Sequence, residues 1–308
     1  MLKLLIRTGA RLAALLAAFA VPASADTSEP DTQPIESIQI VERAGPALWL
    51  VGDEDTTIYL FGTVHALPPG VEWFEGNIAN AFAASDSLVT EVVNKDDTAM
   101  AGQMIKLAML PEGANLRDQL SPEQRAAYDK ALADLAIPPA MLDRFEPWYA
   151  AMALSTLPLM KQGYSPENGV EGQLDKKASA RKMPHQGLET VEYQIGLFDG
   201  LPADVQQRYL GEVIEQLPTI REDIAAIIAA WKSGDAEELA RLMNFGDSDP
   251  VFAETLLTGR NKAWAEWIDE RMDKPGTVFV AVGAGHLAGK GSVQEQLAKR
   301  GIGTARVQ

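Results

Sequence analysis

Segments with the residue composition of β-strands lie near both ends of this chain, and a long, mostly helical stretch separates them. Residues 47–51 and 57–64 are rich in β-branched and aromatic side chains and are joined by an acidic turn, which is typical of a β-hairpin. Near the other end, residues 276–282 form another apolar run. This distribution predicts one α+β domain over 37–308, with a central mixed β-sheet built from both chain ends and a long helical insertion at about 96–272.

The remaining elements are predicted from hydrophobic periodicity and from the Pro and Gly residues between periodic segments. Three further strands are expected at 87–93, 183–188 and 303–307. Helices are expected at 74–85, 290–300 and, within the helical section, near 97–109, 122–135, 148–160, 203–216, 219–232, 235–244 and 250–272.

The composition excludes several classes of protein. Of the 308 residues, 46% are hydrophobic and 23% are charged, which is typical of a soluble globular protein and excludes a disordered or collagen-like chain. The net charge of −16 repels phosphate backbones, so nucleic-acid binding is not expected. Because the chain has no cysteine, disulfides, thiolate metal sites and a cysteine nucleophile are excluded.

The first residues have the three-part pattern of a signal peptide. Basic residues precede a short apolar run at 12–21, and the small residues at 23–25 match a cleavage site. The run is shorter than the roughly 20 residues of a spanning helix, so an uncleaved anchor is not favoured. We expect a signal peptide at 1–25, cleavage after Ala25, a flexible leader at 26–36, and a secreted or periplasmic protein with no stable membrane span.

Two of the three histidines lie in the same local context. Residues 57–64 lead into Gly62-Thr63-Val64-His65, and residues 276–282 lead into Gly283-Ala284-Gly285-His286. A glycine at a strand end permits a tight turn or the close approach of a ligand. If the two strands are neighbours, both imidazole rings converge on one point. Imidazole is the commonest metal ligand and also titrates near neutral pH.

A carboxylate and the third histidine call for different interpretations. Glu91 lies in an apolar strand segment, where a buried acid needs a partner; the alternative is an edge-strand carboxylate that faces water. His185 follows a proline in a polar stretch and is expected at the surface or a strand start, without a catalytic role. A single Gly-x-x-His motif arises easily by chance, and only the pair together with Glu91 indicates a site.

With these motifs, the chain resembles the TraB/GumN family, which includes the Tiki metalloproteases. The resemblance covers nearly all of 47–308 and rests on the stretches IYLFGTVHALPPG, GVEGQLDKKA, GLETVEYQ, LLTGRNKAW and FVAVGAGHLAGKGSVQEQL. It implies the fold of erythromycin esterase and ChaN-like proteins, with both motifs at one site. For the Tiki branch it implies metal-dependent peptide hydrolysis. Bacterial members are often named for polysaccharide biosynthesis or pheromone shutdown, and the missing Tiki membrane anchor argues against carrying over Tiki substrates.

Other residues in these family-like stretches are candidates for the site. Glu171 stands at an expected helix start, where the helix dipole also favours an acid. Glu189 and Glu192 lie at a strand-to-helix junction, and their spacing of three residues predicts that both lie on one helix face. Arg260 is a candidate for binding an anionic intermediate or a carboxylate. Residues proposed to bind substrate are Asn261, beside Arg260, and Gly285 and Ser292 in a glycine-rich loop before a helix.

These residues define a hydrolase hypothesis with open alternatives. His65, Glu91 and His286 form a set that binds Zn²⁺, Mn²⁺ or Co²⁺ and leaves a position for water. Glu189 or Glu171 is then the proton acceptor. A metal-free version uses either histidine as general base with Glu91 orienting it. A different class is a periplasmic binding protein, because ChaN-like relatives carry haem iron. The expected substrate is a peptide or a small envelope molecule, and the oligomeric state stays open.

Overall fold

The computed structural model describes residues 45–93, 97–243 and 249–308. These residues belong to one compact unit. The predicted signal peptide at 1–25 and the predicted leader at 26–36 lie outside the described residues.

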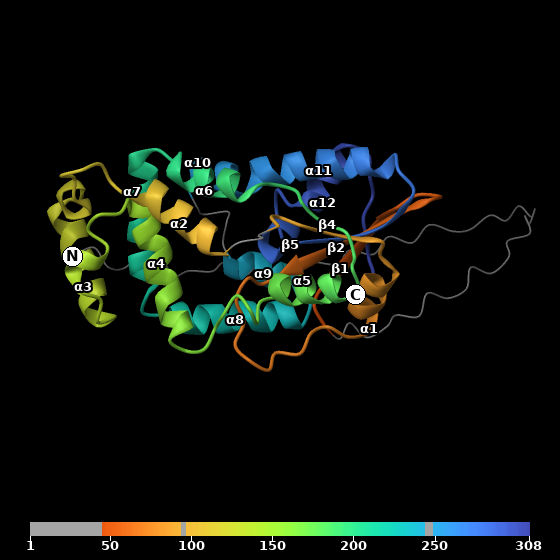
Figure 1. Ribbon diagram of the computed structural model, residues 1–308, viewed down its shortest axis with the longest axis horizontal. Helices are drawn as coiled ribbons and strands as arrows, with labels where there is room; N and C mark the ends of the chain where they lie inside the picture. Colours follow the sequence, from red (N-terminus) through yellow and green to blue (C-terminus); the bar gives the residue numbers. More distant parts are fainter. Residues whose placement is uncertain (1–44, 94–96, 244–248) are drawn as a thin grey trace, which may run out of the picture. The chain divides into compact units, whose positions relative to one another are not determined.

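One six-stranded mixed sheet forms the centre of the described chain, in the order β4-β3-β5-β2-β1-β6 (Figure 1). Strands β2, β5, β3 and β4 are parallel to one another, and β1 and β6 add antiparallel pairs at the other edge. The strand bounds are Leu48–Gly52 (β1), Thr56–Thr63 (β2), Ser87–Thr90 (β3), His185–Gly187 (β4), Gly276–Gly283 (β5) and Ala305–Arg306 (β6). The predicted fold class is confirmed: strands from both chain ends meet in one sheet.

The two motif-bearing strands are neighbours in this sheet. Strand β2 pairs with β5 so that Thr63 lies opposite Gly283, and β3 pairs with β5 so that Thr90 lies opposite Ala281. Because the three strands are parallel, their carboxyl ends reach the same edge of the sheet. The segments that carry both histidines and Glu91 therefore leave the sheet side by side.

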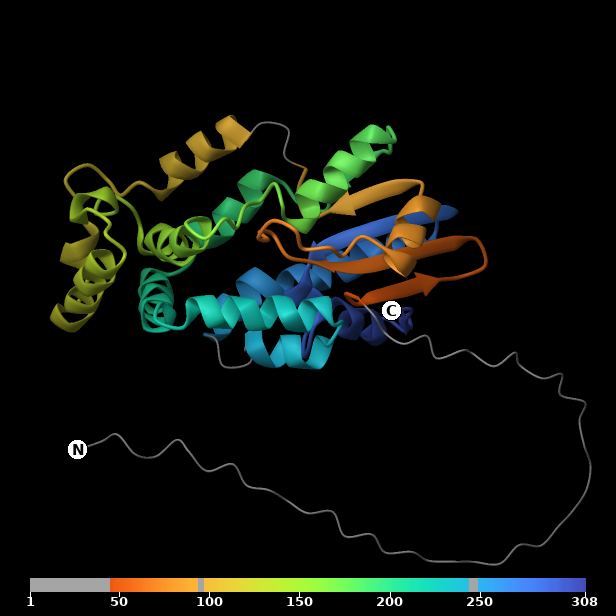
Figure 2. The same ribbon diagram turned by 90° about the horizontal axis from the view of Figure 1, so that it is seen from below.

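Helices cover both faces of the sheet, as the views in Figures 1 and 2 show. Along β5, Phe279 and Ala281 pack with one helical layer and Val278 and Val280 with the other, since successive strand side chains point to opposite faces. The first layer comprises α1 (Gly76–Ala84), α5 (Val170–Ala180), α8 (Ile220–Lys232) and α9 (Ala236–Met243). The second comprises α11 (Gly259–Met272) and α12 (Val293–Lys299).

The rest of the helical section has apolar clusters of its own. Fully buried side chains such as Tyr128 and Leu154 form one cluster, and Trp148 lies at the centre of a smaller one. The helices here are α2 (Asp97–Ala108), α3 (Pro122–Asp134), α4 (Pro147–Met160), α6 (Val191–Asp199), α7 (Ala203–Gln216) and α10 (Pro250–Ala253). Short 3-10 turns lie at η1 (Leu116–Gln119) and η2 (Pro139–Met141).

Three predicted elements differ from the structure in informative ways. The strand expected at 87–93 ends at Thr90, so Glu91 follows the strand. The single helix expected at 250–272 is interrupted by η4 (Glu254–Thr258), one turn of π-helix. The helix expected at 290–300 begins only at Val293, because Gly289 and Gly291 have positive φ values of 67° and 79°.

Among the described residues, no helix has the length and apolar character needed to cross a membrane.

Candidate functional site

His65, Glu91 and His286 meet at the carboxyl edge of the sheet. His65 follows β2, Glu91 follows β3, and His286 lies in η5 (Ala284–Leu287), a 3-10 turn directly after β5. Gly283 lies among them: a β-carbon added there would be 3.1 Å from Glu91 Oε1, 3.5 Å from His65 Nε2 and 3.5 Å from His286 Cδ2. The absent side chain of Gly283 thus leaves a small space that all three groups face.

Glu171 orients the ring of His65. Its Oε1 lies 2.6 Å from His65 Nδ1 and also accepts a hydrogen bond of 2.5 Å from Thr63 Oγ1. Helix α5 reaches this position because Gly169 packs against the backbone of His65: a β-carbon there would be 2.0 Å from the His65 carbonyl oxygen. With Nδ1 bonded to Glu171, Nε2 is the ring nitrogen that faces Gly283.

The charge of Glu171 is the main reason that the pKa of His65 is raised to about 9, although partial desolvation of the ring opposes the shift. Conversely, burial opposes ionisation of Glu171, but His65 and Thr63 keep its pKa below the usual value. The His65 side chain is 71% exposed, so the pair lies at the open side of the site.

Glu91 is a buried carboxylate that accepts hydrogen bonds from three groups. Its Oε1 accepts a hydrogen bond of 2.7 Å from Gly283 N, and its Oε2 accepts bonds from Arg260 Nη2 at 2.6 Å and Gln194 Nε2 at 2.8 Å. Burial alone would raise the pKa of Glu91, but His286, His65, Arg260 and the Gly283 N–H lower it to about 2. Glu91 is therefore ionised, buried and paired, as the interpretation of a buried acid with a partner requires, and the alternative of an edge-strand carboxylate that faces water is wrong.

His286 is held as a neutral ring. Its Nδ1 lies 2.5 Å from Asn261 Oδ1, and its Nε2 lies 3.1 Å from Arg260 Nη1. Asn261 Oδ1 only accepts and a guanidinium only donates, so these partners assign the proton to Nδ1 and the lone pair to Nε2. Burial, with a contribution from Arg260, lowers the pKa of His286 to about 3.

Arg260 and Glu189 form a buried ion pair next to Glu91 and His286. Arg260 Nε lies 2.9 Å from Glu189 Oε1, and Arg260 Nη2 lies 2.8 Å from Glu189 Oε2. Glu189 also accepts bonds from Trp264 Nε1 at 2.9 Å and Gln194 Nε2 at 2.9 Å. The π-helical turn places the Leu256 carbonyl 3.1 Å from Arg260 Nη1. Such turns are frequent at functional sites.

Most of the predicted site residues lie in this cluster, but their contacts differ in kind. His65 and Glu171 form one hydrogen-bonded pair, and a second network joins Glu91, Glu189, Arg260, Asn261 and His286. Asn261 is fully buried and donates its other hydrogen bond to Gly291 O, at 2.9 Å.

The glycine-rich loop is satisfied by its own side chains. Ser292 Oγ caps α12 by accepting a bond of 3.4 Å from Glu295 N, while Gly291 N donates to Glu295 Oε2 at 2.8 Å. Gly285 lies within η5 and is buried. Glu189 precedes the N-cap of α6, so it does not share a helix face with the exposed Glu192.

Thr63, Gln194 and Trp264 belong to the site, although they are not among the residues predicted from the sequence. Thr63 is the second residue of the first Gly-x-x-His motif and hydrogen-bonds Glu171. Trp264 lies four residues after Arg260 on α11, a spacing that puts both on one helix face. Gln194 has no comparable signal, because an amide inside a helix has no distinctive pattern.

His185 lies outside this cluster. Its Nδ1 is 3.0 Å from Asp175 Oδ1, and its Nε2 is 2.8 Å from Thr90 Oγ1. Both ring nitrogens thus have structural partners at the β3–β4 edge.

The donor atoms of the site fit a divalent metal in their chemistry. His65 Nε2 and Glu91 Oε1 face the space at Gly283, and the Nδ1 atom of each histidine already has an acceptor. Metal-binding histidines almost always have this outer hydrogen bond, which fixes the ring and leaves Nε2 for the metal. One contact opposes ligation, because Arg260 Nη1 donates to His286 Nε2. As the described side chains lie, no three His, Asp or Glu residues surround a position for one ion.

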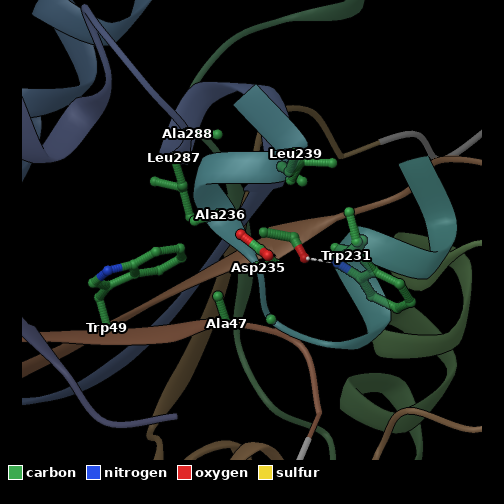
Figure 3. A pocket seen from close by; sticks show the side chains of 12 residues that line it. Ala47, Trp49, Trp231, Asp235, Ala236, Leu239, Leu287 and Ala288 are labelled. Atoms are coloured by element: carbon green, nitrogen blue, oxygen red, sulfur yellow. Dashed lines mark hydrogen bonds between the residues drawn. The ribbon is translucent and has the colours of Figure 1, made fainter. Parts of the chain in front are cut away.

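An apolar pocket lies beside the two motifs, between the sheet and helices α8 and α9 (Figure 3). Trp231 Nε1 donates a hydrogen bond of 2.8 Å to the Gly62 carbonyl, which ties α8 to the end of β2. The residues that line this pocket include Trp49, Leu239 and Ala288, and neither His65 nor His286 is among them.

The fold and the site define a class: an α/β protein in which adjacent parallel strands present two histidines and a glutamate at one edge of the sheet. The family model for the TraB/PrgY/gumN family matches residues 47–306, which spans all six strands. The chain belongs to the TraB/PrgY/gumN family.

Curated relatives are similar along most of the chain. The protein named "Uncharacterized protein YbaP" of Escherichia coli (strain K12) is 24% identical over 253 residues, covering 82% of this chain and 92% of the relative. Its counterpart in Shigella flexneri is 25% identical, covering 78% and 87%. An uncharacterized protein of Treponema pallidum (strain Nichols) is 22% identical, covering 82% and 80%. No solved structure matches significantly.

Proposed function

We propose that the protein is an exported, metal-dependent hydrolase that cleaves amide or ester bonds, with peptides as the first substrates to test. The observation that supports this most is the pair of histidines whose Nδ1 atoms are fixed by Glu171 and Asn261, beside the carboxylate of Glu91. Fixed imidazoles and an ionised carboxylate around a small open space are the components that water activation requires.

In this proposal, three residues are metal ligands and one glutamate is the proton acceptor. His65 Nε2, Glu91 Oε1 and His286 Nε2 would hold the metal, which would polarise the scissile carbonyl and lower the pKa of a bound water. Of the two proposed proton acceptors, Glu171 is favoured, because its Oε2 has no hydrogen-bond partner among the described residues. Both oxygens of Glu189 are engaged with Arg260, Trp264 and Gln194, so Glu189 holds Arg260 in place.

A metal-free hydrolase uses the same residues in different roles. His65 Nε2 then accepts the proton from water and Glu171, in place of the expected Glu91, stabilises the imidazolium. This version requires neutral His65, whose pKa is about 9, so its rate rises with pH up to that value. The haem-carrier alternative needs the same exchange as the catalytic metal, since Arg260 bonds to His286 Nε2.

Export is part of the proposal and rests on the sequence at 1–25 alone. The test is to express the full chain, fractionate the cells and determine the N-terminal residue of the mature protein. A chain that begins at Asp26 in the exported fraction agrees with cleavage after Ala25.

The hydrolase is tested with the purified mature chain and a library of fluorogenic peptides and aryl esters. Activity is measured in EDTA and with added Mn²⁺, Co²⁺ or Zn²⁺. His65→Ala and His286→Ala are compared with His185→Ala, a matched control because it removes the remaining histidine of the chain. We expect metal-stimulated hydrolysis that both site variants lose and the control retains. Absence of hydrolysis under all these conditions, together with a Soret band on addition of haem, would support the carrier instead.

A further inference from the structure

We infer that Arg260 is a built-in, exchangeable competitor for the metal: its Nη1 occupies His286 Nε2, and metal binding replaces this single hydrogen bond. The inference rests on the proposed function, because it concerns the metal affinity of the same site. It goes beyond the ligand set by assigning control of metal affinity to a residue that is not a ligand.

Arg260 can release His286 without losing its place. Its Nε and Nη2 atoms stay bonded to Glu189 at 2.9 and 2.8 Å, and Nη1 keeps the Leu256 carbonyl at 3.1 Å. The guanidinium also lies over the ring of Trp264, 4.8 Å from its centroid. Because Nη1 keeps the Leu256 carbonyl, the exchange breaks one hydrogen bond and leaves one of the two Nη1–H groups without an acceptor, a cost that lowers the metal affinity.

The two carboxylate oxygens of Glu91 face different cations, the guanidinium of Arg260 and the proposed metal ion. Arg260 and Gln194 bind Oε2, whereas Oε1 accepts a hydrogen bond from the Gly283 N–H alone among the described residues and faces the space at Gly283. Glu91 therefore offers Oε1 to a metal while Oε2 stays bonded to Arg260. The conflict between the two cations is confined to His286.

The charge of Arg260 opposes a second cation at short range. Its side chain is 9% exposed, and buried charges are screened by solvent much less than exposed ones. In the metal-free protein, the guanidinium satisfies His286, Glu91 and Glu189 together. The metal must displace one of these bonds and tolerate the remaining charge, so the wild-type protein binds it weakly and exchanges it readily.

The test is a titration of the mature, EDTA-treated protein with Co²⁺, followed by the visible absorbance of the ion. Wild type is compared with Arg260→Gln, Arg260→Lys and the double variant Arg260→Gln/His286→Ala. Arg300→Gln is the matched control, since Arg300 pairs with Asp269 at 2.7 Å on the surface. We expect Arg260→Gln to lower the Kd for Co²⁺ at least about tenfold, the size of effect common for residues next to metal ligands.

The other variants distinguish the effect of the Arg260 hydrogen bond to His286 Nε2 from the effect of the Arg260 charge. Arg260→Lys keeps the charge but lacks the planar fork, so its Kd should fall between those of wild type and Arg260→Gln. The double variant should lose the gain, and Arg300→Gln should match wild type. A folded Arg260→Gln that binds Co²⁺ no more tightly than wild type overturns the inference, as does a gain that survives His286→Ala.

A separate measurement decides the case if Arg260→Gln does not fold. In wild type, Zn²⁺ should shift the ¹⁵N resonance of His286 Nε2, and an unchanged resonance at saturating Zn²⁺ overturns the inference.

A failure of the proposed function can be distinguished from a failure of this inference. If Arg260→Gln binds Co²⁺ tightly and no variant hydrolyses any substrate, the competitor stands and the hydrolase fails. If wild type hydrolyses peptides in EDTA and no variant binds Co²⁺, the competitor fails and a hydrolase remains.

Discussion

Asn261 Oδ1 lies 2.5 Å from Nδ1 of His286, and this bond determines which nitrogen of His286 faces the site. The amide oxygen accepts the Nδ1–H proton, so the lone pair is on Nε2, where Arg260 donates. Asn261 also binds the Gly291 carbonyl, which links His286 to the loop before α12. A fully buried residue that the sequence suggested for substrate binding thus positions a histidine instead.

Replacing Asn261 by Ala should release the ring of His286. Without the acceptor, the ring is held only through Nε2 by Arg260, and metal affinity or activity should fall about 10- to 100-fold, as for other residues that orient metal ligands. Two-bond ¹H–¹⁵N correlation spectra of the histidine rings report the tautomer directly. An Nε2–H tautomer in the metal-free wild type, or unchanged metal affinity and activity in a folded Asn261→Ala variant, would contradict this assignment.

Gly283→Ala should fill the space at which the site converges. The added β-carbon would lie 3.1 Å from Glu91 Oε1 and 3.5 Å from His65 Nε2, contacts that small side-chain shifts accommodate. We expect a folded protein whose hydrolysis and Co²⁺ binding are both reduced by at least about tenfold. The measurements are turnover, the Kd for Co²⁺ and thermal unfolding.

Gly211→Ala is the control for this substitution. Gly211 lies within α7, and a β-carbon there would meet nothing within 4 Å. Because Ala favours the helix over Gly, this variant should be stabilised by about 0.5–1 kcal/mol with unchanged activity. Equal losses of activity in both variants would show that the effect at Gly283 is not local.

The location of the site could be predicted from the sequence because it depends on local pattern and on topology. Apolar runs before His65 and His286 predict strands, and neighbouring parallel strands bring their carboxyl ends to one edge. Glu91 could be added because an acid beside an apolar strand needs a partner. No more than strand order was required for these three residues.

The contacts that assign roles could not be predicted in this way. Gln194 Nε2 bonds to Glu91 across 103 positions of sequence, and nothing in the α6 pattern marks this amide. The periodicity of 250–272 predicts one continuous helix, whereas a π-turn changes the direction in which Arg260 and Asn261 point. Such contacts depend on how layers pack, and hydrophobic periodicity reports only which face of an element is buried.

Acid should destabilise the metal-free protein through His286. Its pKa is about 3 in the folded state and 6.5 in the unfolded chain, so the unfolded chain binds an extra proton between these values. Stability therefore falls as pH decreases below 6.5 and is unaffected by this group above it. Glu91, with a folded pKa of about 2 against 4.5, adds a further loss below pH 4.5.

Urea unfolding at pH 7.5, 6.5, 5.5 and 4.5 tests this dependence, with His286→Gln as the comparison. The variant should lose less unfolding free energy than wild type when the pH falls from 6.5 to 4.5, because it lacks the titrating imidazole. Parallel losses in both proteins would mean that His286 is protonated in the folded state.

Glu171→Gln should bring the pKa of His65 down from about 9 towards 6.5, since the charge of Glu171 is the largest cause of the shift. The change in free energy of unfolding should be small, because the His65 ring is mostly exposed and its ion pair is screened. The sequence has three histidines, so their ring protons can be followed individually in an NMR titration from pH 5 to 10. Thr63→Val, which removes the other hydrogen bond to the same Glu171 oxygen, is the matched control and should shift this pKa far less.

The pH profile of kcat/KM in the Glu171→Gln variant separates the two hydrolytic mechanisms. If His65 acts as a general base without metal, the rise in rate moves to lower pH with the pKa. If His65 binds a metal, the same substitution removes the proposed proton acceptor, so the rate falls and added Mn²⁺ or Co²⁺ does not restore it.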